Sequence, residues 1–381
     1  MNYTTIEEIR SLYPFLEQGK IYFNHASIGP LSKLVVSSLN EYIYTRSAGS
    51  IKNFDTFISA DNNGREKLGK LLNCEPNRVT WVDNVSNGMN LLANSLEWQK
   101  GDEIILNDME FPANVYPFLN LQAKGVVVKI VKSKEGKVLI EDLREAITNR
   151  TKLLSISYVQ FFSGYRSDLV ELGKLCKYNN IIFSVDVIQA AGAFSIDVKS
   201  MNIDFLCGGT QKWLMGLQGL SYMYIAEKLQ QKMKQAFVGW LSVKDYWNLL
   251  NYDLTLKDDT QSFFNGSVNL IGIVAADTNL GMFLNFGIDR IEKHVLENTK
   301  YLQEGLKTLG IKSVLYGEEE KHLSGIVTFG LEDAEDFRTL AEKNNIVFEL
   351  RQGKIRLAPH FYNIKTEFDK LLNLLNDFLK K

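Results

Sequence analysis

Short apolar runs alternate with amphipathic segments through the middle of the chain. Between residues 79 and 225 the runs are β-branched or aromatic, and several are apolar at both alternating sets of positions, as in strands covered on both faces. The segments between them have helical spacing. The pattern predicts an α/β fold with a mainly parallel sheet and helices on both faces, with strands at 103–108, 126–131, 153–159, 181–187, 204–209 and 220–225.

One segment, SDLVELGKLCKYNN, illustrates the helical spacing. Leu169, Leu172 and Leu175 fall on one face of a helix. Ser167 is expected to cap its first turn, and an Asn-Asn pair can end it. The predicted helix leads directly into the strand at 181–187.

The pattern changes after about residue 255, first to a long apolar helix and then to a mixture of helices and strands. We expect three parts, and no repeat or low-complexity linker separates them. They are an N-terminal segment, 1–20, that packs with a small domain; a large ligand-binding domain, 21–284; and the small C-terminal domain, 285–381.

Composition indicates a small-molecule partner. The 43 Lys and Arg residues nearly balance 45 Asp and Glu residues, so nothing global attracts nucleic acid or membrane. Three cysteines and four histidines are scattered, which predicts neither a disulfide framework nor a metal site. The chain begins without signal-peptide character and has no stretch of 18 apolar residues, so a cytoplasmic location is expected.

Two strand ends carry unusual chemistry. Asp186 ends a buried strand and is followed by Gln189, while Lys212 follows the next strand and a Gly-Gly pair. Ligands of open α/β sheets bind at such ends. Pyridoxal 5'-phosphate (PLP) needs an amine for its aldehyde and a carboxylate that keeps its pyridine nitrogen protonated. Either residue alone would more often be structural, but together they predict PLP held as a Schiff base on Lys212.

With these residues in place, the chain resembles the fold-type I, class V PLP-dependent enzymes. That family includes cysteine desulfurases, kynureninase and isopenicillin N epimerase-like proteins. The resemblance extends from YFNHASIGPLS at 22–32 to IRLAPHFYN at 355–363. It implies the PLP-dependent transferase fold, in which a large α/β/α domain carries a smaller α+β C-terminal domain.

The segment VTWVDNVSNGMN predicts a strand, a turn and a helix whose first amides can face an anion. The resemblance implies that Ser86 and Asn87 bind the PLP phosphate there. Thr210 and Gln211 resemble further phosphate contacts of the same subunit, although relatives more often have histidine in place of Gln211. Without Lys212, an ordinary Asn/Ser/Gly turn would be preferred.

In EFPAN, Phe111 stands where many relatives stack an aromatic ring on the cofactor and desulfurases usually have histidine. Such stacking contributes on the order of 1 kcal/mol, but phenylalanine cannot transfer protons. Local sequence alone equally allows a core phenylalanine.

The resemblance also implies substrate and subunit contacts. Arg356 resembles the arginine that grips a substrate α-carboxylate through two parallel hydrogen bonds. His25 and Ala26 resemble a segment that approaches the substrate. Gly266 and Ser267 stand where a Gly-Thr pair reaches the phosphate of the other subunit, which implies a homodimer with shared active sites.

Two departures separate the chain from desulfurases. No cysteine lies between Arg351 and Arg356, and Cys207 is expected to be a buried structural thiol. Phe161 occupies a position where the family usually has asparagine. Tyr158, Gln160 and Arg166 could supply polar groups instead.

We therefore expect an amino-acid-transforming PLP enzyme of the class V aminotransferase type, acting by transamination or α-carbon epimerisation. A carbon–sulfur or carbon–carbon lyase is the alternative within the same chemistry. A catalytically silent protein that keeps the fold is a second alternative. A nicotinamide-dependent dehydrogenase is disfavoured, because no G-x-G-x-x-G follows a predicted strand.

Overall fold

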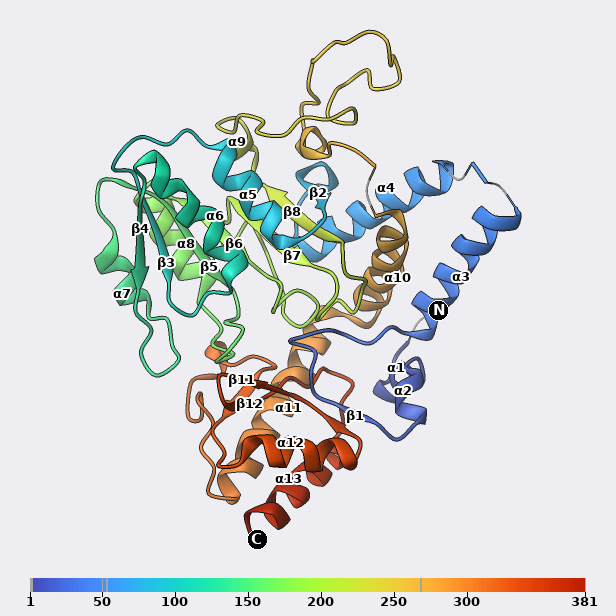
Figure 1. The fold of residues 1–381 in the computed structure, drawn as a ribbon, viewed down its shortest axis with the longest axis vertical. Coiled ribbons are helices and arrows are strands. Elements are labelled where there is room, and N and C mark those ends of the chain that lie inside the picture. The colour runs from blue at the N-terminus through green and yellow to red at the C-terminus, as the bar shows by residue number, and fades with distance from the viewer. Residues whose placement is uncertain (1–2, 50, 53, 268, 381) are drawn as a thin grey trace.

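The computed structural model describes residues 3–49, 51–52, 54–267 and 269–380. A seven-stranded sheet forms the centre of the larger part of the molecule (Figure 1). Its spatial order is β2 (Val79–Val82), β8 (Ser221–Ile225), β7 (Phe205–Gly209), β6 (Ile182–Asp186), β5 (Thr151–Ser157), β3 (Glu103–Asn107) and β4 (Val127–Val131). β8 is antiparallel to both neighbours, and the other pairs are parallel. The predicted mainly parallel sheet is confirmed, with strand ends within two residues of the predicted runs.

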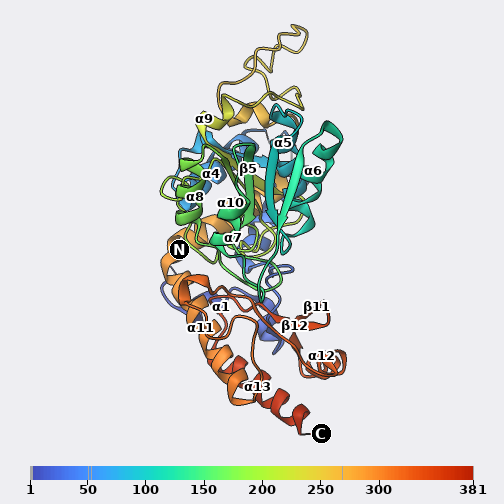
Figure 2. The same cartoon turned by 90° about the vertical axis from the view of Figure 1, so that its left-hand side faces the viewer.

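Helices cover both faces of this sheet (Figure 2). Because strand side chains alternate between faces, Leu153 and Cys207 pack with α5 and α6, whereas Leu154 and Leu206 pack with the opposite layer. The helices of the larger part are α3 (Lys33–Ala48), α4 (Phe54–Leu72), α5 (Val85–Ser95), α6 (Tyr116–Leu119), α7 (Ile140–Ala146), α8 (Leu169–Tyr178), α9 (Glu227–Gln230) and α10 (Leu270–Phe286).

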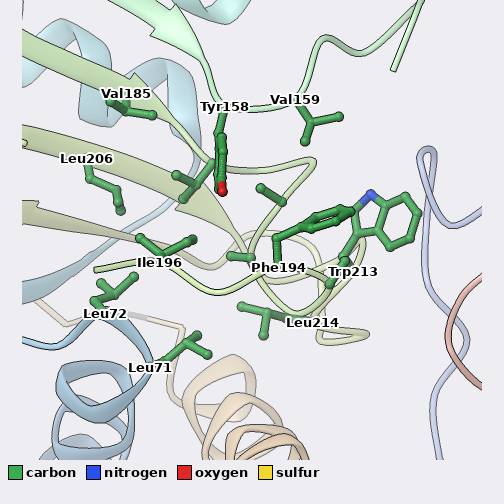
Figure 3. Packing of buried hydrophobic residues seen from close by; sticks show 14 of the residues in the cluster. Leu71, Leu72, Tyr158, Val159, Val185, Phe194, Ile196, Leu206, Trp213 and Leu214 are labelled. Carbon is green, nitrogen blue, oxygen red and sulfur yellow. The ribbon is translucent and has the colours of Figure 1, made fainter. Parts of the chain in front are cut away.

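The core continues to the residue that follows Lys212. Trp213 is fully buried, and it lies with Phe194 in the cluster that also contains Val185 and Leu206 (Figure 3). The indole Nε1 of Trp213 donates a hydrogen bond to Gln189 Oε1 at 2.8 Å. This packing fixes the backbone that presents Lys212.

The start of α8 corrects one sequence prediction. Asp168, rather than Ser167, is the N-cap, and its carboxylate accepts a hydrogen bond from the Glu171 amide at 3.1 Å. The Ser167 hydroxyl instead lies 3.4 Å from the Ser157 carbonyl oxygen. The predicted end is confirmed, since Asn179 is the C-cap.

The C-terminal part is an α+β layer below the large sheet in Figure 1. Its antiparallel sheet has the order β11 (Glu349–Arg351), β12 (Lys354–Leu357) and β9 (Val327–Phe329). α11 (Ile288–Thr308), α12 (Ala334–Lys343) and α13 (Lys365–Leu379) contribute to one apolar cluster with it. No single helix among the described residues is long and apolar enough to cross a membrane. α10 and α11 pass that test only together, and the chain bends by 80° between them.

The N-terminus packs against the C-terminal part. Its elements are α1 (Ile6–Arg10), α2 (Pro14–Glu17) and β1 (Ile21–Tyr22), and β1 pairs in parallel with β10 (Ile346–Val347). Arg10 forms a 2.8 Å ion pair with Glu367. Residues 21–22 thus pair with the C-terminal part, although the sequence groups them with the large domain. The boundaries at 20 and 284 stay predictions.

Gly173 offers a test of the packing of α8. Alanine would normally favour a helix by about 1 kcal/mol over glycine, but a Cβ here would lie 1.9 Å from the Met201 carbonyl oxygen. Backbone crowding therefore outweighs propensity. We expect Gly173→Ala to lower the free energy of unfolding by about 1–3 kcal/mol, measured by urea denaturation.

Gly330 supplies the matched control, because a Cβ there meets nothing within 4 Å. Gly330→Ala should change stability by less than about 0.5 kcal/mol. A Gly173→Ala protein as stable as the wild type would contradict the packing.

Candidate active site

Parallel strand ends bring the candidate residues to one edge of the large sheet. β2, β3, β5, β6 and β7 all run in the same direction, since β2 and β7 are each antiparallel to β8. Their carboxyl ends therefore open at the same edge, where ligands of such sheets bind. Asp186 ends β6 and pairs in register with Ser157 of β5, while Lys212 follows β7.

Asp186 is a buried carboxylate with one atom unused. Its Oδ1 accepts a hydrogen bond from the Ile188 amide at 2.8 Å, whereas Oδ2 has no hydrogen-bond partner among the described residues. Burial raises the pKa of Asp186, and the negative charge of Glu110 acts in the same direction. The Ile188 amide and Lys212 oppose this shift. A cation at Oδ2 would stabilise the ionised form.

Lys212 faces the aromatic ring predicted to stack. Its Nζ lies 5.6 Å from the centre of the Phe111 ring, and Phe111 makes an edge-on contact with Phe161 at 5.3 Å. Phe111 remains 44% exposed, so its ring is accessible. Burial lowers the pKa of the Lys212 amine and Arg356 lowers it further, while Asp186 raises it. The structure thus brings Lys212, Phe111 and Asp186 into one neighbourhood.

Arg356 is a buried guanidinium with no carboxylate within ion-pair distance among the described residues. Its Nη1 donates to the Phe161 carbonyl and its Nη2 to Ser27 Oγ, both at 2.8 Å. Its Nε is buried without a partner in the described chain. Burial lowers the pKa of Arg356 to about 10, which leaves the side chain charged at neutral pH. Because burying an unpaired charge is energetically costly, a bound anion would stabilise this guanidinium.

The start of α5 has the geometry of an anion site. The first amides of a helix have no intrahelical partner, and the capping Asn84 side chain accepts a hydrogen bond from one of them, the Asn87 amide, at 2.9 Å. Ser86 is exposed in this first turn. The Asn87 side chain donates to Asp83 at 3.3 Å, so its own amide group is partly engaged. The backbone amides and the Ser86 hydroxyl are suited to an anion, and phosphate binding by Ser86 and Asn87 stays a prediction.

Two predicted contacts are engaged within the loop around Lys212. The Thr210 hydroxyl lies 2.8 Å from the Leu217 carbonyl and 3.0 Å from the Leu220 carbonyl, so its hydrogen is held by the loop. The Gln211 carbonyl accepts from the Gly29 amide at 2.7 Å. The roles of Thr210 and Gln211 in phosphate binding stay predictions.

Gln189 links this loop to the N-terminal segment. Its Nε2 donates to the Ala26 carbonyl at 3.0 Å, and its Oε1 accepts from Trp213. Ala26 is 1% exposed. One Gln189 N–H remains available for the predicted cofactor contact.

His25 is buried with both ring nitrogens engaged. Nδ1 lies 2.8 Å from the Ala358 carbonyl, and Nε2 lies 2.6 Å from the Tyr362 hydroxyl. The carbonyl requires a proton on Nδ1, so Nε2 accepts from Tyr362. Burial lowers the pKa of His25 to about 4, and the ring is neutral. His25 thereby joins the N-terminal segment to Ala358, the residue after β12. Its predicted substrate contact would require these bonds to exchange.

Glu110 is a functional candidate that the sequence interpretation missed. Its carboxylate accepts five hydrogen bonds, at 2.6–2.9 Å, from Asn107 Nδ2, Asn114 Nδ2, Ser157 N, Ser157 Oγ and Gln160 Nε2. The network ties the residues on both sides of Phe111 to the end of β5. Two asparagines three or four residues from a strand-end acid were the available signal.

Of the three polar residues considered in place of the missing asparagine, Gln160 has a buried side-chain oxygen, Oε1, without a hydrogen-bond partner in the described chain. Arg166 forms a 2.6 Å ion pair with Glu292 and contacts the Phe194 ring. Tyr158 is buried beside Arg166. Gly266 and Ser267 lie between the exposed loop after α9 and α10, with the Ser267 side chain exposed.

The donor set fits the predicted cofactor. The unpartnered Asp186 Oδ2 suits a protonated pyridine nitrogen, the Lys212 amine suits an aldehyde, and the Phe111 ring suits an aromatic plane. The first turn of α5 suits a phosphate.

Comparison with known proteins agrees with this chemistry. The model of the family "Aminotransferase class-V" matches residues 21–365. An uncharacterized aminotransferase YcbU from Bacillus subtilis (strain 168) is 26% identical over 95% of each chain.

Solved structures share the fold. The apo cysteine desulfurase from Thermococcus onnurineus NA1 has a TM-score of 0.90 at 23% identity, with full coverage of both chains. A C-DES mutant with glycine covalently linked to its PLP cofactor has a TM-score of 0.89 at 21% identity, covering 97% of this chain and 99% of that one. The family match spans most of the chain, which therefore belongs to the PLP-dependent class V aminotransferase family.

Proposed function

We propose that the protein transforms an amino acid whose α-carboxylate is held by Arg356, by transamination or by epimerisation at the α-carbon. The observation that carries this proposal is the buried Arg356 guanidinium, which has no carboxylate partner among the described residues. Two fixed neighbours, Ser27 and the Phe161 carbonyl, orient it. A bidentate carboxylate contact would position the substrate beside Lys212.

Lys212, Asp186 and Phe111 would each have a different role in the proposed reaction. PLP, when bound, supplies an electron sink for negative charge at the substrate α-carbon. The Lys212 amine, whose pKa is lowered by burial and by Arg356, can take the α-proton and return it. Asp186 would hold the cofactor's protonated ring nitrogen through its negative charge, and Phe111 would stack on the cofactor's ring.

The positions of the thiols argue against persulfide formation. Cys207 is fully buried and points into the layer of α5, because a Cβ on Gly88 would lie 2.5 Å from its Sγ. Burial raises the pKa of both Cys74 and Cys176 to about 12, so their reactive thiolates are disfavoured. β11 and β12 are joined by only Gln352 and Gly353, both with positive φ, which confirms the predicted lack of a mobile loop.

A carbon–sulfur lyase is the second candidate. The structure of the cystine C–S lyase C-DES in complex with its reaction product cysteine persulfide matches this chain with a TM-score of 0.86 at 21% identity. A lyase needs no protein thiol as nucleophile, so the absence of one near Lys212 among the described residues does not exclude it. Release of pyruvate from cystine or cysteine would favour this function over transamination.

We further propose a cytoplasmic homodimer in which Gly266 and Ser267 reach the partner's phosphate site. Support comes from the neighbouring loop, which protrudes at the top of Figure 1. Large apolar side chains on it are exposed, among them Leu250 at 86% and Tyr252 at 91%. Surface of this kind is typical of protein interfaces. Sedimentation that found a fully active monomer would contradict the dimer.

Arg356→Ala should weaken amino-acid binding by roughly 1.5–3 kcal/mol, the value of hydrogen bonds to a charged group. Dissociation constants from titration of the cofactor's visible spectrum measure the effect. Arg356→Lys, which keeps the charge in the buried position, should lose less, and the exposed Arg338→Ala serves as control. Unchanged affinity in a folded Arg356→Ala protein would refute the carboxylate role.

Asp186→Asn should retain PLP more readily than activity, because the carboxylate acts mainly on the charge of the ring nitrogen. Single-turnover kinetics should show the loss in the proton-transfer step, while cofactor absorbance persists. Near-wild-type turnover would mean that Asp186 is structural.

Incubation with cysteine should shift the PLP spectrum without forming a protein persulfide. Mass spectrometry of the intact protein tests this, alongside a variant in which Cys74, Cys176 and Cys207 are replaced by serine. A persulfide on Cys207, with activity lost in the triple variant, would instead establish a desulfurase.

A further inference from the structure

The hairpin formed by β11 and β12 has one charged and one apolar face. Its register places Glu349 opposite Arg356 and Arg351 opposite Lys354. Residues directly opposite in an antiparallel pair share a face, as do residues two apart on one strand. All four therefore lie on one face. The intervening side chains pack in the C-terminal core, namely Leu350, Ile355 and Leu357.

The charged face is turned towards the candidate active site. Arg356 reaches the Phe161 carbonyl and Ser27, and Lys354 Nζ lies 5.9 Å from the centre of the Phe162 ring. Phe161 in turn contacts Phe111 beside Lys212. The hairpin thus places Arg356 and Lys354 along the segment that borders the proposed substrate site, and Arg351 lies opposite Lys354 on the same face.

These cations are incompletely neutralised. Arg351 lies 3.6 Å from Glu349, the one carboxylate on this face. Within the described chain, neither Lys354 nor Arg356 has a carboxylate within 4 Å. A substrate α-carboxylate on Arg356 would still leave a positive charge in excess.

The positive field of the hairpin also reaches the lysine. Besides burial, Arg356 and Arg351 both lower the pKa of Lys212, while Asp186 raises it. An amino acid whose α-carboxylate is its one anionic group would leave part of the hairpin's positive charge without a counter-charge.

We propose that the substrate is an amino acid with a second anionic group on its side chain, bound by Lys354 and Arg351 while Arg356 holds the α-carboxylate. This inference rests on the proposed function and narrows its substrate class. Positions two apart on a strand are separated by about 7 Å. Lysine and arginine side chains are long and flexible enough to close on both ends of a short dicarboxylate from that spacing.

Binding without turnover gives the first test. Isothermal titration calorimetry of the PLP-loaded protein compares succinate and glutarate with their monoamides. The dicarboxylates should bind at least about tenfold more tightly, as expected for one added charged hydrogen bond. Lys354→Met and Arg351→Gln should each reduce that ratio. Lys343→Met, an exposed cation at the end of α12, is the matched control and should leave it unchanged.

Kinetics identify the anionic group. The ratio of kcat/KM for glutamate over glutamine, and for aspartate over asparagine, should favour the acid and fall in the same two variants. Cysteate and phosphoserine, tested in parallel, distinguish sulfonate and phosphate from carboxylate.

The outcomes separate the two proposals. If the monoamides bind through Arg356 as tightly as the dicarboxylates, or if the preference survives in both hairpin variants, the second anion site is refuted and the proposed function stands. If no carboxylate binds and Arg356→Ala changes nothing, the proposed function itself fails.

Discussion

A buried carboxylate with one oxygen left without a hydrogen-bond partner is the constraint on which the site depends. Asp186 ends a central strand, and its Oδ2 has no hydrogen-bond partner in the described chain. Lys212 offsets part of the charge without forming an ion pair in the described chain, so Oδ2 itself still requires a hydrogen-bonding cation or a proton. A protonated pyridine nitrogen supplies the cation. Lys212, Phe111 and Arg356 lie near the same space. A cofactor bound at Asp186 would explain why an amine, an aromatic ring and a guanidinium are gathered there.

Much of the fold and the centre of the site could be predicted from the sequence. Strands covered on both faces read as continuous apolar runs, and each predicted run between 103 and 225 is a strand. Because parallel strands open at one edge, Asp186 and Lys212 could be placed together although 26 positions separate them. The short link before Arg356 was also predictable, since too few residues remain there for a loop.

The hydrogen-bond partners that the site residues find in distant parts of the chain could not be predicted from the sequence. Thr210, Gln189 and His25 satisfy their polar groups through backbone or side chains brought near by folding, such as the Ala358 carbonyl that holds His25. The residues next to each of these positions in the sequence do not indicate which distant groups will come within hydrogen-bond distance. The same limit hid Glu110, whose five donors come from two segments about 50 residues apart. Ser167 and Asp168 both have side chains that can cap a helix, so the sequence did not decide that Asp168 would be the N-cap of α8.

Borohydride reduction tests whether Lys212 carries PLP as a Schiff base. The purified protein reconstituted with PLP should show a visible absorbance band that borohydride bleaches, and peptide mass spectrometry should then find the reduced cofactor on the peptide containing Lys212. Lys212→Ala should bind PLP without this covalent link. Absence of cofactor absorbance after reconstitution, or an adduct on a different lysine, would contradict the account.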